Sequence, residues 1–348
     1  MSRVLVDADV LGRRRTGDET YVTQLLSGLA TSRLAGQVEA VTRHPELVPP
    51  GITPVRLPAR SSELRMVWSL PRLLRRRRPD LAHFQYVIPP GWRGRSAVTV
   101  HDLSFERRGD LMGRADRTLM RTLVPRAVRR ADLVLTVSEF SKADLVECYR
   151  ADPGRIVVTP NGVDEIFSPT GDRPSGAPYL LFVGALQPRK NPVLAVEALA
   201  ALGGHLRMLL VGPHKAGLEE VRAAITRLGL DSRVELLGHV DRPRLAALYR
   251  GAECLVFPSS YEGFGLPVLE AMASGTPVVA SDTTALPEVA GDAAVLVPLG
   301  DPEVLAGGIA RALADRDRLR AAGLERAAGF TWAALAERTV AAYEEVLS

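Results

Sequence analysis

Cysteine is scarce in this sequence, and its scarcity excludes two ways of stabilising a fold. The two cysteines, Cys148 and Cys254, lie far apart in a chain of 348 residues. They indicate neither a disulfide framework nor the clustered ligands of a structural zinc site. A reducing cytoplasm is therefore the expected compartment.

Long hydrophobic runs are also lacking. The N-terminal stretch MSRVLVDADVLGRRR has only a few consecutive apolar residues before Asp7 and Asp9, which is typical of a first buried strand and not of a signal peptide or membrane span. Neither an internal repeat with a period of about 20–50 residues nor a low-complexity tract is found. With 46% hydrophobic and 24% charged residues, the composition is that of a globular protein with a full core, and 348 residues are enough for two domains.

Charge is distributed unevenly along the chain. Residues 1–170 carry 27 Lys and Arg against 19 Asp and Glu, a net charge of +8, whereas residues 171–348 carry 17 against 21, a net charge of −4. Solvated helix faces are the simpler explanation of the basic excess, and contact with an anionic membrane surface or a phosphorylated acceptor is the alternative. Nucleic-acid binding is not expected, because no aromatic residues are interleaved with the basic ones. Much of the excess lies in the clusters Arg13–Arg15, Arg75–Arg78, Arg107/Arg108 and Arg129/Arg130.

Short β-rich runs alternate with helical stretches throughout the first half. Continuous apolar runs of this kind are typical of a parallel sheet that helices cover on both faces, so a doubly wound α/β domain is predicted. The expected strands are RVLVD, VEAVT, TPVRL, DLAHF, SAVTV, DLVLTV and IVVTP, and the expected crossover helices are residues 20–31, 62–78, 114–130 and 139–150.

The same alternation restarts after SPTGDRPSGAP, residues 168–178, a polar stretch rich in proline and glycine that is the expected linker. We therefore predict two Rossmann-like domains, residues 1–168 and 178–330, that face each other across a cleft. The amphipathic tail, residues 331–348, is expected to form a helix that crosses back to the first domain and packs on both. The second set of strands is PYLLFVG, LRMLLVG, RVELLG, CLVF and PVVAS, with helices near 192–202, 218–229, 242–250 and 267–274.

The most informative segment, residues 258–275, reads PSSYEGFGLPVLEAMASG. A strand ends, a glycine-bearing loop follows, and a helix begins near Pro267. The backbone N–H groups at such a helix start, at the positive end of the helix dipole, suit a diphosphate. Glu262 in the loop and Glu270 in the expected first helical turn can point into one cleft, where carboxylates accept hydrogen bonds from sugar and ribose hydroxyls. A turn followed by an acid that only stabilises its helix is the alternative explanation.

A second motif, FVGALQPRKNP, follows the first strand of the second domain. Gly184 lets the chain turn tightly at the strand end, and Arg189 and Lys190 bring positive charge to the place where a leaving diphosphate gathers negative charge. A surface Arg-Lys pair at a helix start is the structural alternative.

The stretch EGFGLPVLEAMASGTPVV resembles the retaining glycosyltransferases of family four, whose signature is Glu-x7-Glu and whose fold, called GT-B, has two Rossmann-like domains. Glu262 and Glu270 match the signature in full, and the resemblance covers nearly the whole chain. It implies that Glu262 and the amides after it hold hydroxyls of the donor sugar, and that Glu270 accepts the ribose hydroxyls. The donor site implied by this stretch comprises Glu262, Gly263, Phe264, Gly265, Leu266 and Glu270.

The resemblance extends to the basic motif. In the family a basic pair neutralises the diphosphate without a metal ion, and Lys190 aligns with the family's lysine. The family's arginine often follows the glycine directly, where this chain has Ala185, so Arg189 is the candidate replacement. Val240, in the LLGHV segment, either lines the nucleotide base pocket as in the family or packs in the core.

In the first domain, the segment VTVHDLSF lies at a strand's carboxyl end, where open α/β sheets place ligands. Family members with a similar HDLSF segment have this histidine beside the transferring sugar, which implies that His101 contacts the donor sugar or the acceptor. Asp102 either orients His101 or caps the next turn. Ser138 is expected to cap a helix, with a contact to the acceptor or a donor phosphate as the alternative.

The segment TGDETY, residues 16–21, corresponds to the family's glycine-rich loop. This chain keeps Gly17 but has Glu19 where a second glycine is common. Because an acid repels a diphosphate, we expect this loop to shape the acceptor pocket or to meet a sugar hydroxyl. PNGVD, residues 160–164, resembles a family segment near the cleft, and a plain turn explains it equally well.

Together these features predict a hexosyltransferase of glycoconjugate or polysaccharide biosynthesis. By resemblance, it moves a sugar, with mannose favoured and GDP-mannose as the favoured donor, to the hydroxyl of a sugar, lipid-linked or small-molecule acceptor, with retention of configuration and no metal or cofactor. We expect it in the cytoplasm, with the inner membrane face as a further site if the basic clusters bind lipid. A nucleotide-sugar epimerase, a phosphorylase using one of Lys142, Lys190 and Lys215, and an inactive partner-binding homologue are the alternatives.

Overall fold

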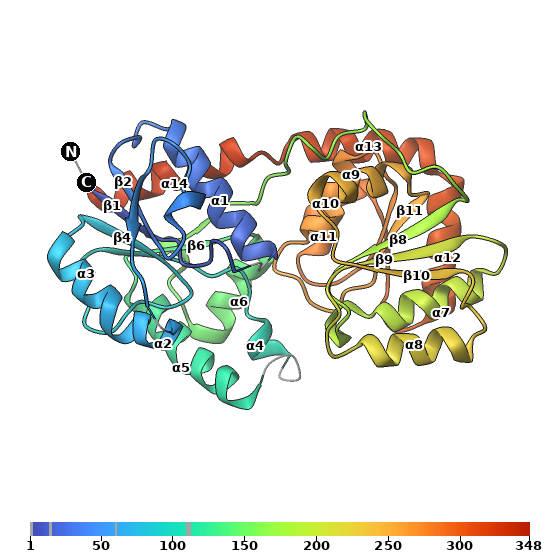
Figure 1. Ribbon diagram of the computed structural model, residues 1–348, viewed down its shortest axis with the longest axis horizontal. Helices are drawn as coiled ribbons and strands as arrows, with labels where there is room; N and C mark the ends of the chain where they lie inside the picture. The colour runs from blue at the N-terminus through green and yellow to red at the C-terminus, as the bar shows by residue number, and fades with distance from the viewer. Residues whose placement is uncertain (1–2, 14–15, 60, 109–112) are drawn as a thin grey trace. The chain divides into compact units, whose positions relative to one another are not determined.

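The computed structural model describes residues 3–13, 16–59, 61–108 and 113–348. They form two compact units, each built around its own parallel sheet (Figure 1). The first unit is Met1–Gly162 with Thr331–Ser348, and the second is Val163–Phe330. The exposed stretch 168–178, where the sequence places a linker, has neither helix nor strand and belongs to the second unit.

The first unit contains a seven-stranded parallel sheet in the order β3-β2-β1-β4-β5-β6-β7. Its strands are β1 (Val4–Asp7), β2 (Val38–Thr42), β3 (Thr53–Arg56), β4 (Leu81–Gln85), β5 (Ser96–Thr99), β6 (Leu133–Thr136) and β7 (Ile156–Val158). Its helices are α1 (Thr16–Thr31), α2 (Ser62–Leu64), α3 (Leu70–Arg77), α4 (Ser104–Arg107), α5 (Arg114–Arg130), α6 (Glu139–Tyr149) and α14 (Trp332–Leu347), and a π-helical turn, Arg65–Ser69, joins α2 to α3.

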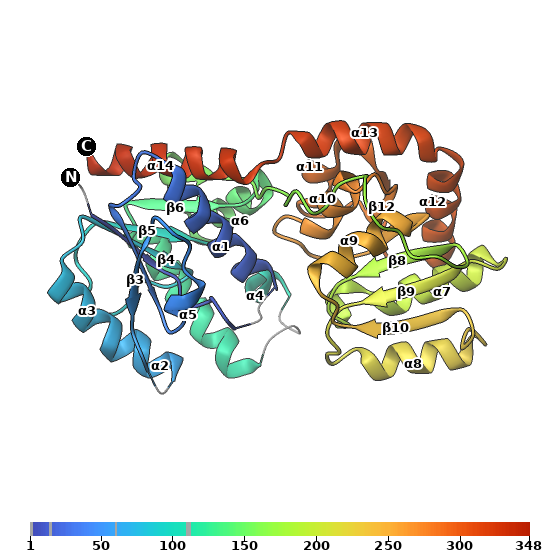
Figure 2. The ribbon, with the colours of Figure 1, turned by 45° about the horizontal axis from the view of Figure 1, so that its top comes forward.

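Helices cover both faces of this sheet. Helices α1 and α14 pack together on one face, and a Cβ at Gly28 would lie 2.3 Å from the Cβ of Ala336, so glycine permits their close approach (Figure 2). On the other face, Leu74 of α3, Val124 of α5 and Leu145 of α6 join the buried strand residues in one core. The sequence expectation of a doubly wound domain is confirmed.

The second unit contains a six-stranded parallel sheet in the order β10-β9-β8-β11-β12-β13. Its strands are β8 (Tyr179–Val183), β9 (Arg207–Val211), β10 (Val234–Gly238), β11 (Cys254–Phe257), β12 (Val278–Ser281) and β13 (Val295–Val297). Its helices are α7 (Pro192–Leu202), α8 (Leu218–Arg227), α9 (Arg242–Gly251), α10 (Leu266–Ala273), α11 (Leu286–Ala290), α12 (Pro302–Ala314) and α13 (Arg316–Ala328).

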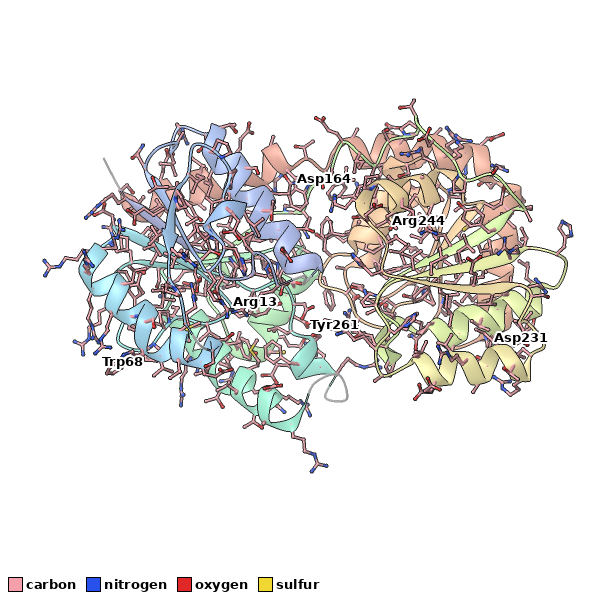
Figure 3. The ribbon with its side chains drawn as sticks, viewed as in Figure 1. Arg13, Trp68, Asp164, Asp231, Arg244 and Tyr261 are labelled. Atoms are coloured by element: carbon pink, nitrogen blue, oxygen red, sulfur yellow. The ribbon has the colours of Figure 1, made fainter. Side chains whose placement is uncertain are left out.

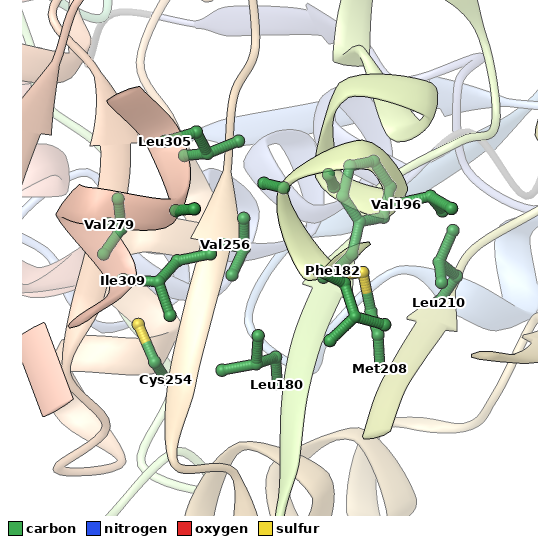
Figure 4. Close-up of a cluster of buried hydrophobic side chains, with 14 of the residues drawn as sticks. Leu180, Phe182, Val196, Met208, Leu210, Cys254, Val256, Val279, Leu305 and Ile309 are labelled. Atoms are coloured by element: carbon green, nitrogen blue, oxygen red, sulfur yellow. The ribbon is translucent and has the colours of Figure 1, made fainter. Parts of the chain in front are cut away.

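An apolar cluster of this unit lies between the sheet and helices α7, α8 and α12 (Figure 4). Phe182 of β8 and Val256 of β11 contribute from the strands, and Val196 of α7 and Ile309 of α12 contribute from the helices. The inner strands β8, β11 and β12 are short apolar runs buried on both faces, the pattern typical of parallel sheets. Together, the two sheets and their helices are the GT-B architecture that the sequence predicts.

One boundary differs from the prediction in a way that affects the site. Helix α1 begins at Thr16, four residues before the expected start at residue 20. Asp18 and Glu19 therefore lie in its first turn, where acids interact favourably with the helix dipole. The segment compared with a glycine-rich loop is consequently helical, and the loop assignment for Gly17 and Glu19 is wrong.

Candidate active site

The second sheet reverses its strand order between β8 and β11, and the polar segments of interest follow these two strands. The chain runs outward from β8 to β9 and β10 and then returns to add β11 on the other side of β8. Ligands of open α/β sheets bind outside the carboxyl ends of the strands at such a switch point. The segment with Lys190 follows β8, and the segment with Glu262 follows β11.

Lys190, Arg189 and Glu262 form a buried ionic cluster at this edge. The ammonium of Lys190 donates to the Oε1 atom of Glu262, and Nη1 of Arg189 lies 3.2 Å from Oε2 of the same carboxylate. The side chains of Lys190 and Glu262 are each only 10% exposed. Burial opposes ionisation of Glu262, but the charges of Lys190 and Arg189, with hydrogen bonds from Lys190 and Ser259, outweigh it. The pKa of Glu262 is therefore below its ordinary value, and the carboxylate is ionised at neutral pH.

Backbone hydrogen bonds tie the two segments of this cluster together. The carbonyl of Arg189 accepts from the backbone N–H of Ser260 at 2.8 Å and from its hydroxyl at 3.0 Å. Asn191, with a φ of 49°, ends the turn Pro188–Lys190 and donates its side-chain N–H to the carbonyl of Pro258 at 2.9 Å. The positions of the cations and of the acid are thus fixed by the same two loops.

The glycine-bearing loop before α10 requires glycine at one position for two reasons. Gly265 has a φ of 108°, and a Cβ there would lie 2.6 Å from Cδ2 of Leu286. The backbone N–H of Glu262 donates to the hydroxyl of Thr284 at 3.0 Å, and Phe264 is buried with its ring 5.8 Å from that of Phe330. The loop therefore has a fixed shape at the start of α10, where the helix dipole favours an anion.

Glu270 has different partners from Glu262. It lies in the second turn of α10, because the helix begins at Leu266, so its predicted place in the first turn is wrong. The hydroxyl of Tyr249 donates to Oε2 of Glu270 at 3.0 Å. Burial raises the pKa of Glu270 to about 7, with the Tyr249 hydrogen bond and the charge of Arg242 acting in the opposite direction. This carboxyl changes its charge near neutral pH.

The other predicted donor residues lie in segments that follow strands of the second sheet. Gly184 follows β8, and the aliphatic stem of Lys190 passes within 3.5 Å of the position that a Cβ of Gly184 would occupy. The carbonyl of Gly184 would lie 2.0 Å from a Cβ at Gly212, which has a φ of 145°. Val240 follows β10 and is buried. Leu266 is the first residue of α10.

In the first unit, His101 follows β5 and is enclosed by aromatic rings. The ring centroid of Tyr21 lies 4.6 Å away, edge-on, and that of Tyr86 lies 5.6 Å away. Its Nε2 atom is 3.1 Å from Oε1 of Gln85, the last residue of β4. Burial lowers the pKa of His101, and the charges of Asp18 and Asp102 only partly oppose this, so the ring is neutral at pH 7.

Asp102 and Ser138 both cap local structure. A carboxylate oxygen of Asp102 accepts from the backbone N–H of Ser104 at 2.9 Å. The hydroxyl of Ser138 accepts from the backbone N–H of Ser141 at 3.0 Å, which confirms its predicted N-cap of α6. Ser141 in turn donates to the carbonyl of His101 at 3.2 Å, so α6 is tied to the histidine loop.

Glu19 also has a backbone partner, because its carboxylate accepts from the N–H of Gly12 at 2.7 Å. It thereby holds the chain segment that precedes α1. Arg14 and Arg15, the rest of the first basic cluster, lie outside the described residues. In the PNGVD segment, Asp164 pairs with Arg242, in the second unit.

Sequence reasoning missed a chain of buried hydrogen bonds in the first unit. The hydroxyl of Tyr343 lies 2.6 Å from Nδ1 of His83, and Nε2 of His83 lies 2.7 Å from the hydroxyl of Thr99. The same hydroxyl is 3.1 Å from that of Tyr21, whose ring contacts His101. These hydrogen bonds thus connect α14 through β4, β5 and α1 to the ring of His101. The only available signal was polar residues within otherwise apolar strands.

An ionic cluster at the end of β1 was also missed. Arg65 is buried and binds Asp7 through both terminal nitrogens, at 3.0 and 2.5 Å. Arg43 binds Asp9 through two nitrogens, at 2.9 and 3.0 Å. The contacts of Arg65 fix the π-helical turn to the sheet.

Within the described ranges, no three His, Cys, Asp or Glu side chains are grouped as metal ligands would be. No described helix is both long and apolar enough to cross a membrane.

Comparison with known proteins identifies related sequences for nearly the whole chain. A family model described as Glycosyltransferase Family 4 matches residues 15–166, and one described as Glycosyl transferases group 1 matches residues 164–327. The O-antigen chain mannosyltransferase B of Escherichia coli is 30% identical over 267 residues, which cover 72% of this chain and 70% of the relative. The D-inositol 3-phosphate glycosyltransferase of Nocardia farcinica is 36% identical over 301 residues, covering 77% and 67%.

Solved structures resemble the chain over its full length. A sucrose-phosphate synthase from Thermosynechococcus elongatus has a TM-score of 0.83 and 25% identity, covering 99% of each chain. Anabaena HepE in complex with UDP and glucose has a TM-score of 0.75 and 17% identity, covering 99% of this chain and 100% of the other. At that identity, HepE supports the fold alone.

Proposed function

The chain belongs to glycosyltransferase family 4, the retaining enzymes that use a nucleotide-sugar donor, and we propose that it transfers a hexose, with mannose favoured, to an acceptor hydroxyl. The observation that carries this proposal is the buried cluster of Lys190, Arg189 and Glu262 at the switch point of the second sheet. GDP-mannose is the favoured donor. Support for mannose comes from the likeness to a mannosyltransferase of Escherichia coli.

Lys190 and Arg189 have the charge and the position to bind the diphosphate. A diphosphate at the start of α10 would compete with Glu262 for both cations, because it carries more negative charge than one carboxylate. Glu262 would then be able to accept hydrogen bonds from sugar hydroxyls, beside the amides of Phe264 and Gly265. The attraction between the two cations and the leaving oxygen would increase as negative charge develops on that oxygen. An interaction that is stronger in the transition state than in the ground state lowers the barrier. No metal ion is needed in this scheme.

The remaining donor contacts follow from the positions of the side chains. Glu270 would accept the ribose hydroxyls when ionised, with Tyr249 holding its other side. Gly184, with a φ of 157°, adopts a backbone conformation beside the Lys190 stem that would be strained with a side chain, and Val240 and Leu266 offer apolar contact.

The transfer is a displacement on one face of the sugar. A bond forms between the acceptor oxygen and the anomeric carbon while the bond from that carbon to the diphosphate oxygen breaks. The proton of the acceptor hydroxyl passes to the departing phosphate oxygen, so no side chain has to form a covalent intermediate. His101, neutral at pH 7, would contact the donor sugar or the acceptor through a hydrogen bond, with Asp102, Ser138, Gly17 and Glu19 shaping that side.

The acceptor is proposed to be a sugar, a lipid-linked sugar or a small molecule carrying a hydroxyl. We propose further that the protein works in the cytoplasm and reaches the inner membrane face through its basic first unit. Nucleic acid is not among the proposed partners.

A donor panel tests the proposal. The melting temperature of the purified protein is measured with GDP-, UDP- and dTDP-sugars, and products are identified by mass spectrometry after incubation with sugar, lipid-linked and small-molecule acceptors. We expect the largest stabilisation with GDP-mannose and a product heavier by one hexose. A stabilising response only to a donor without guanine would reject the GDP-mannose assignment.

A further inference from the structure

Three large apolar side chains are exposed together on the segment Ser62–Arg78 of the first unit. The exposed fractions are 55% for Leu64, 61% for Val67 and 59% for Trp68. Figure 3 shows Trp68 on the outer side of the segment that runs from α2 to α3. Exposed tryptophan is costly in water and favourable at an interface that is apolar on one side and polar on the other.

Exposure and spacing together place these residues on the outer side of the segment. Leu64, Val67 and Trp68 recur at intervals of three and one residues across α2 and the π-helical turn. The exposed Arg72, Arg75 and Arg76 follow at intervals of at most four residues along α3. The face is thus apolar in its first half and cationic in its second half. We call it the Trp68 face, comprising Leu64, Val67, Trp68, Arg72, Arg75 and Arg76.

The opposite side of the segment is firmly anchored. Arg65 is buried and binds Asp7 at the end of β1, and Leu70 and Leu74 belong to the core of the unit. The segment therefore cannot roll inward to bury Trp68 without breaking a buried ion pair and removing two core side chains. The Trp68 face is held outward by the fold.

The charge of this face indicates the chemical class of its partner. The segment Ser62–Arg78 contains six arginines and one acid, Glu63. Arg65 is neutralised by Asp7, and Arg77 pairs with Glu39 at 2.8 Å. The guanidinium of Arg72 lies 3.4 Å above the ring of Trp68, so the two form an amphipathic pair. An arginine-rich face with tryptophan and aliphatic residues is suited to the headgroup and upper acyl region of an anionic bilayer.

We propose that the Trp68 face docks the protein on an anionic lipid surface, inserting Trp68, Val67 and Leu64 between headgroups that Arg72, Arg75 and Arg76 bind. This inference rests on the proposed function, in that it names the surface by which the enzyme reaches a membrane-borne acceptor. Arg65 lies three residues from Trp68 and contacts Asp7 at the carboxyl end of β1. The apolar half of the face is therefore near the sheet edge from which His101 also extends.

Sedimentation with lipid vesicles tests the proposal. The full-length protein is mixed with phosphatidylcholine vesicles, or with vesicles containing 30% phosphatidylglycerol, in low and high salt. We expect binding only to the anionic vesicles, weakened by salt because the screening length shortens. Val67→Ser with Trp68→Ser should reduce the partition coefficient at least tenfold. Arg75→Ala with Arg76→Ala should reduce it roughly fivefold for each arginine.

Matched controls separate the face from its surroundings. Leu47→Ser removes an apolar side chain that is 45% exposed in the same unit, and Arg129→Ala with Arg130→Ala removes two exposed arginines of α5. Both should bind vesicles like the wild type. Equal binding to neutral vesicles, or wild-type binding by the Trp68 and Arg75 variants, would overturn the proposal. A wild-type dimer on gel filtration that the Trp68 variant abolishes would also overturn the proposal, because the face would then contact a second copy of the chain.

The response to GDP-mannose, measured by thermal shift on every variant, keeps this inference separate from the proposed function. Lost vesicle binding with an unchanged melting temperature and donor response supports the Trp68 face as a docking surface. If the protein binds vesicles but responds to no guanine donor, the docking proposal holds and the donor assignment is wrong.

Discussion

Buried polar groups of opposite character lie at the carboxyl edge of the second sheet, the charged edge, and in the interior of the first unit, where His83, Thr99, Tyr21 and Tyr343 form a neutral chain. In the second unit, the carboxylate of Glu262 is ionised beside Lys190 and Arg189. In the first, His83, Tyr21 and Tyr343 are uncharged at neutral pH, because burial lowers the pKa of His83 to about 3 and raises that of Tyr21 to about 12. The charged edge could exchange one anion for another, as the proposed diphosphate binding and release require. The neutral chain can only position groups.

The largest expected effect comes from removing the charged edge. Lys190→Ala or Glu262→Ala should lower kcat about 100- to 1000-fold, because loss of one donor aimed at developing charge costs about 3–4 kcal/mol. Steady-state kinetics with the best donor measures this. Lys215→Ala, which removes an exposed lysine of the same unit, should leave kcat unchanged.

The fold of these variants must be checked, since breaking a buried ion pair also destabilises. Arg189 remains beside Glu262 when Lys190 is removed, so the carboxylate keeps one cationic partner and the protein should stay folded. A cooperative melt with unchanged circular dichroism would show this. Near-normal turnover in both folded variants would remove the charged edge from the mechanism.

The next largest effect concerns the loop that presents Glu262. Gly265→Ala should destabilise the protein by about 2–4 kcal/mol, because it combines a strained backbone with overpacking against Leu286. Gly300→Ala is the matched control, since Gly300 has a φ of 111° and no neighbour where its Cβ would be. It should cost only about 1 kcal/mol, the backbone part alone. Denaturant unfolding measures both, and equal losses would mean that Leu286 gives way easily.

Glu270 sharpens the comparison, because it lies at the charged edge yet has a raised pKa. Its folded pKa of about 7 exceeds the ordinary value of 4.5, so the folded state holds a proton that the unfolded chain releases between these values. Stability from this group is present below about pH 4.5 and is lost as pH rises through 7. Glu270→Gln should therefore raise the stability at pH 8 by on the order of 2 kcal/mol, with little gain at pH 5.

The same substitution should weaken donor binding by about five- to tenfold at pH 8, because an ionised acceptor makes stronger hydrogen bonds than an amide. Wild-type affinity should fall as pH drops below 7, and that of Glu270→Gln should not. Tyr249→Phe removes the hydrogen bond that lowers the Glu270 pKa, so it should move the wild-type transition to higher pH. This account would be contradicted if the wild type and Glu270→Gln had the same stability at every pH.

The sequence predicted best what depends on local order. Residues 114–130 and 192–202 form helices with the predicted bounds, because apolar periodicity and flanking strand ends define them. The rule that parallel strands end at one edge of a sheet predicts that Lys190 and Glu262 lie close together, as they do. The start of α1 was missed, because the strong helix signal begins at residue 20 and the preceding turn depends on the Gly12–Glu19 contact.

Contacts between distant residues could not be predicted in this way. Tyr343 and His83 are separated by 260 positions, and nothing in either neighbourhood indicates the other. The pKa of Glu270 depends on Tyr249, which lies in the preceding helix, α9, on the other side of β11 in the sequence. The sequence does not indicate the elements between β12 and α14, since β13 has only three residues and the helices after it follow one another without intervening strands.

The smallest expected effect on turnover comes from the neutral chain. Tyr343→Phe leaves Nδ1 of His83 buried without its hydroxyl partner, so it should destabilise the protein by about 1–2 kcal/mol. Because Thr99 still contacts Nε2 of His83 and Tyr21 still packs on His101, kcat should change less than about threefold. Thr339→Val removes a buried hydroxyl from the same helix that bonds only within it, and should cost less. If Tyr343→Phe instead lowered kcat as strongly as Lys190→Ala, the neutral chain would take part in the chemistry and the contrast between the two units would fail.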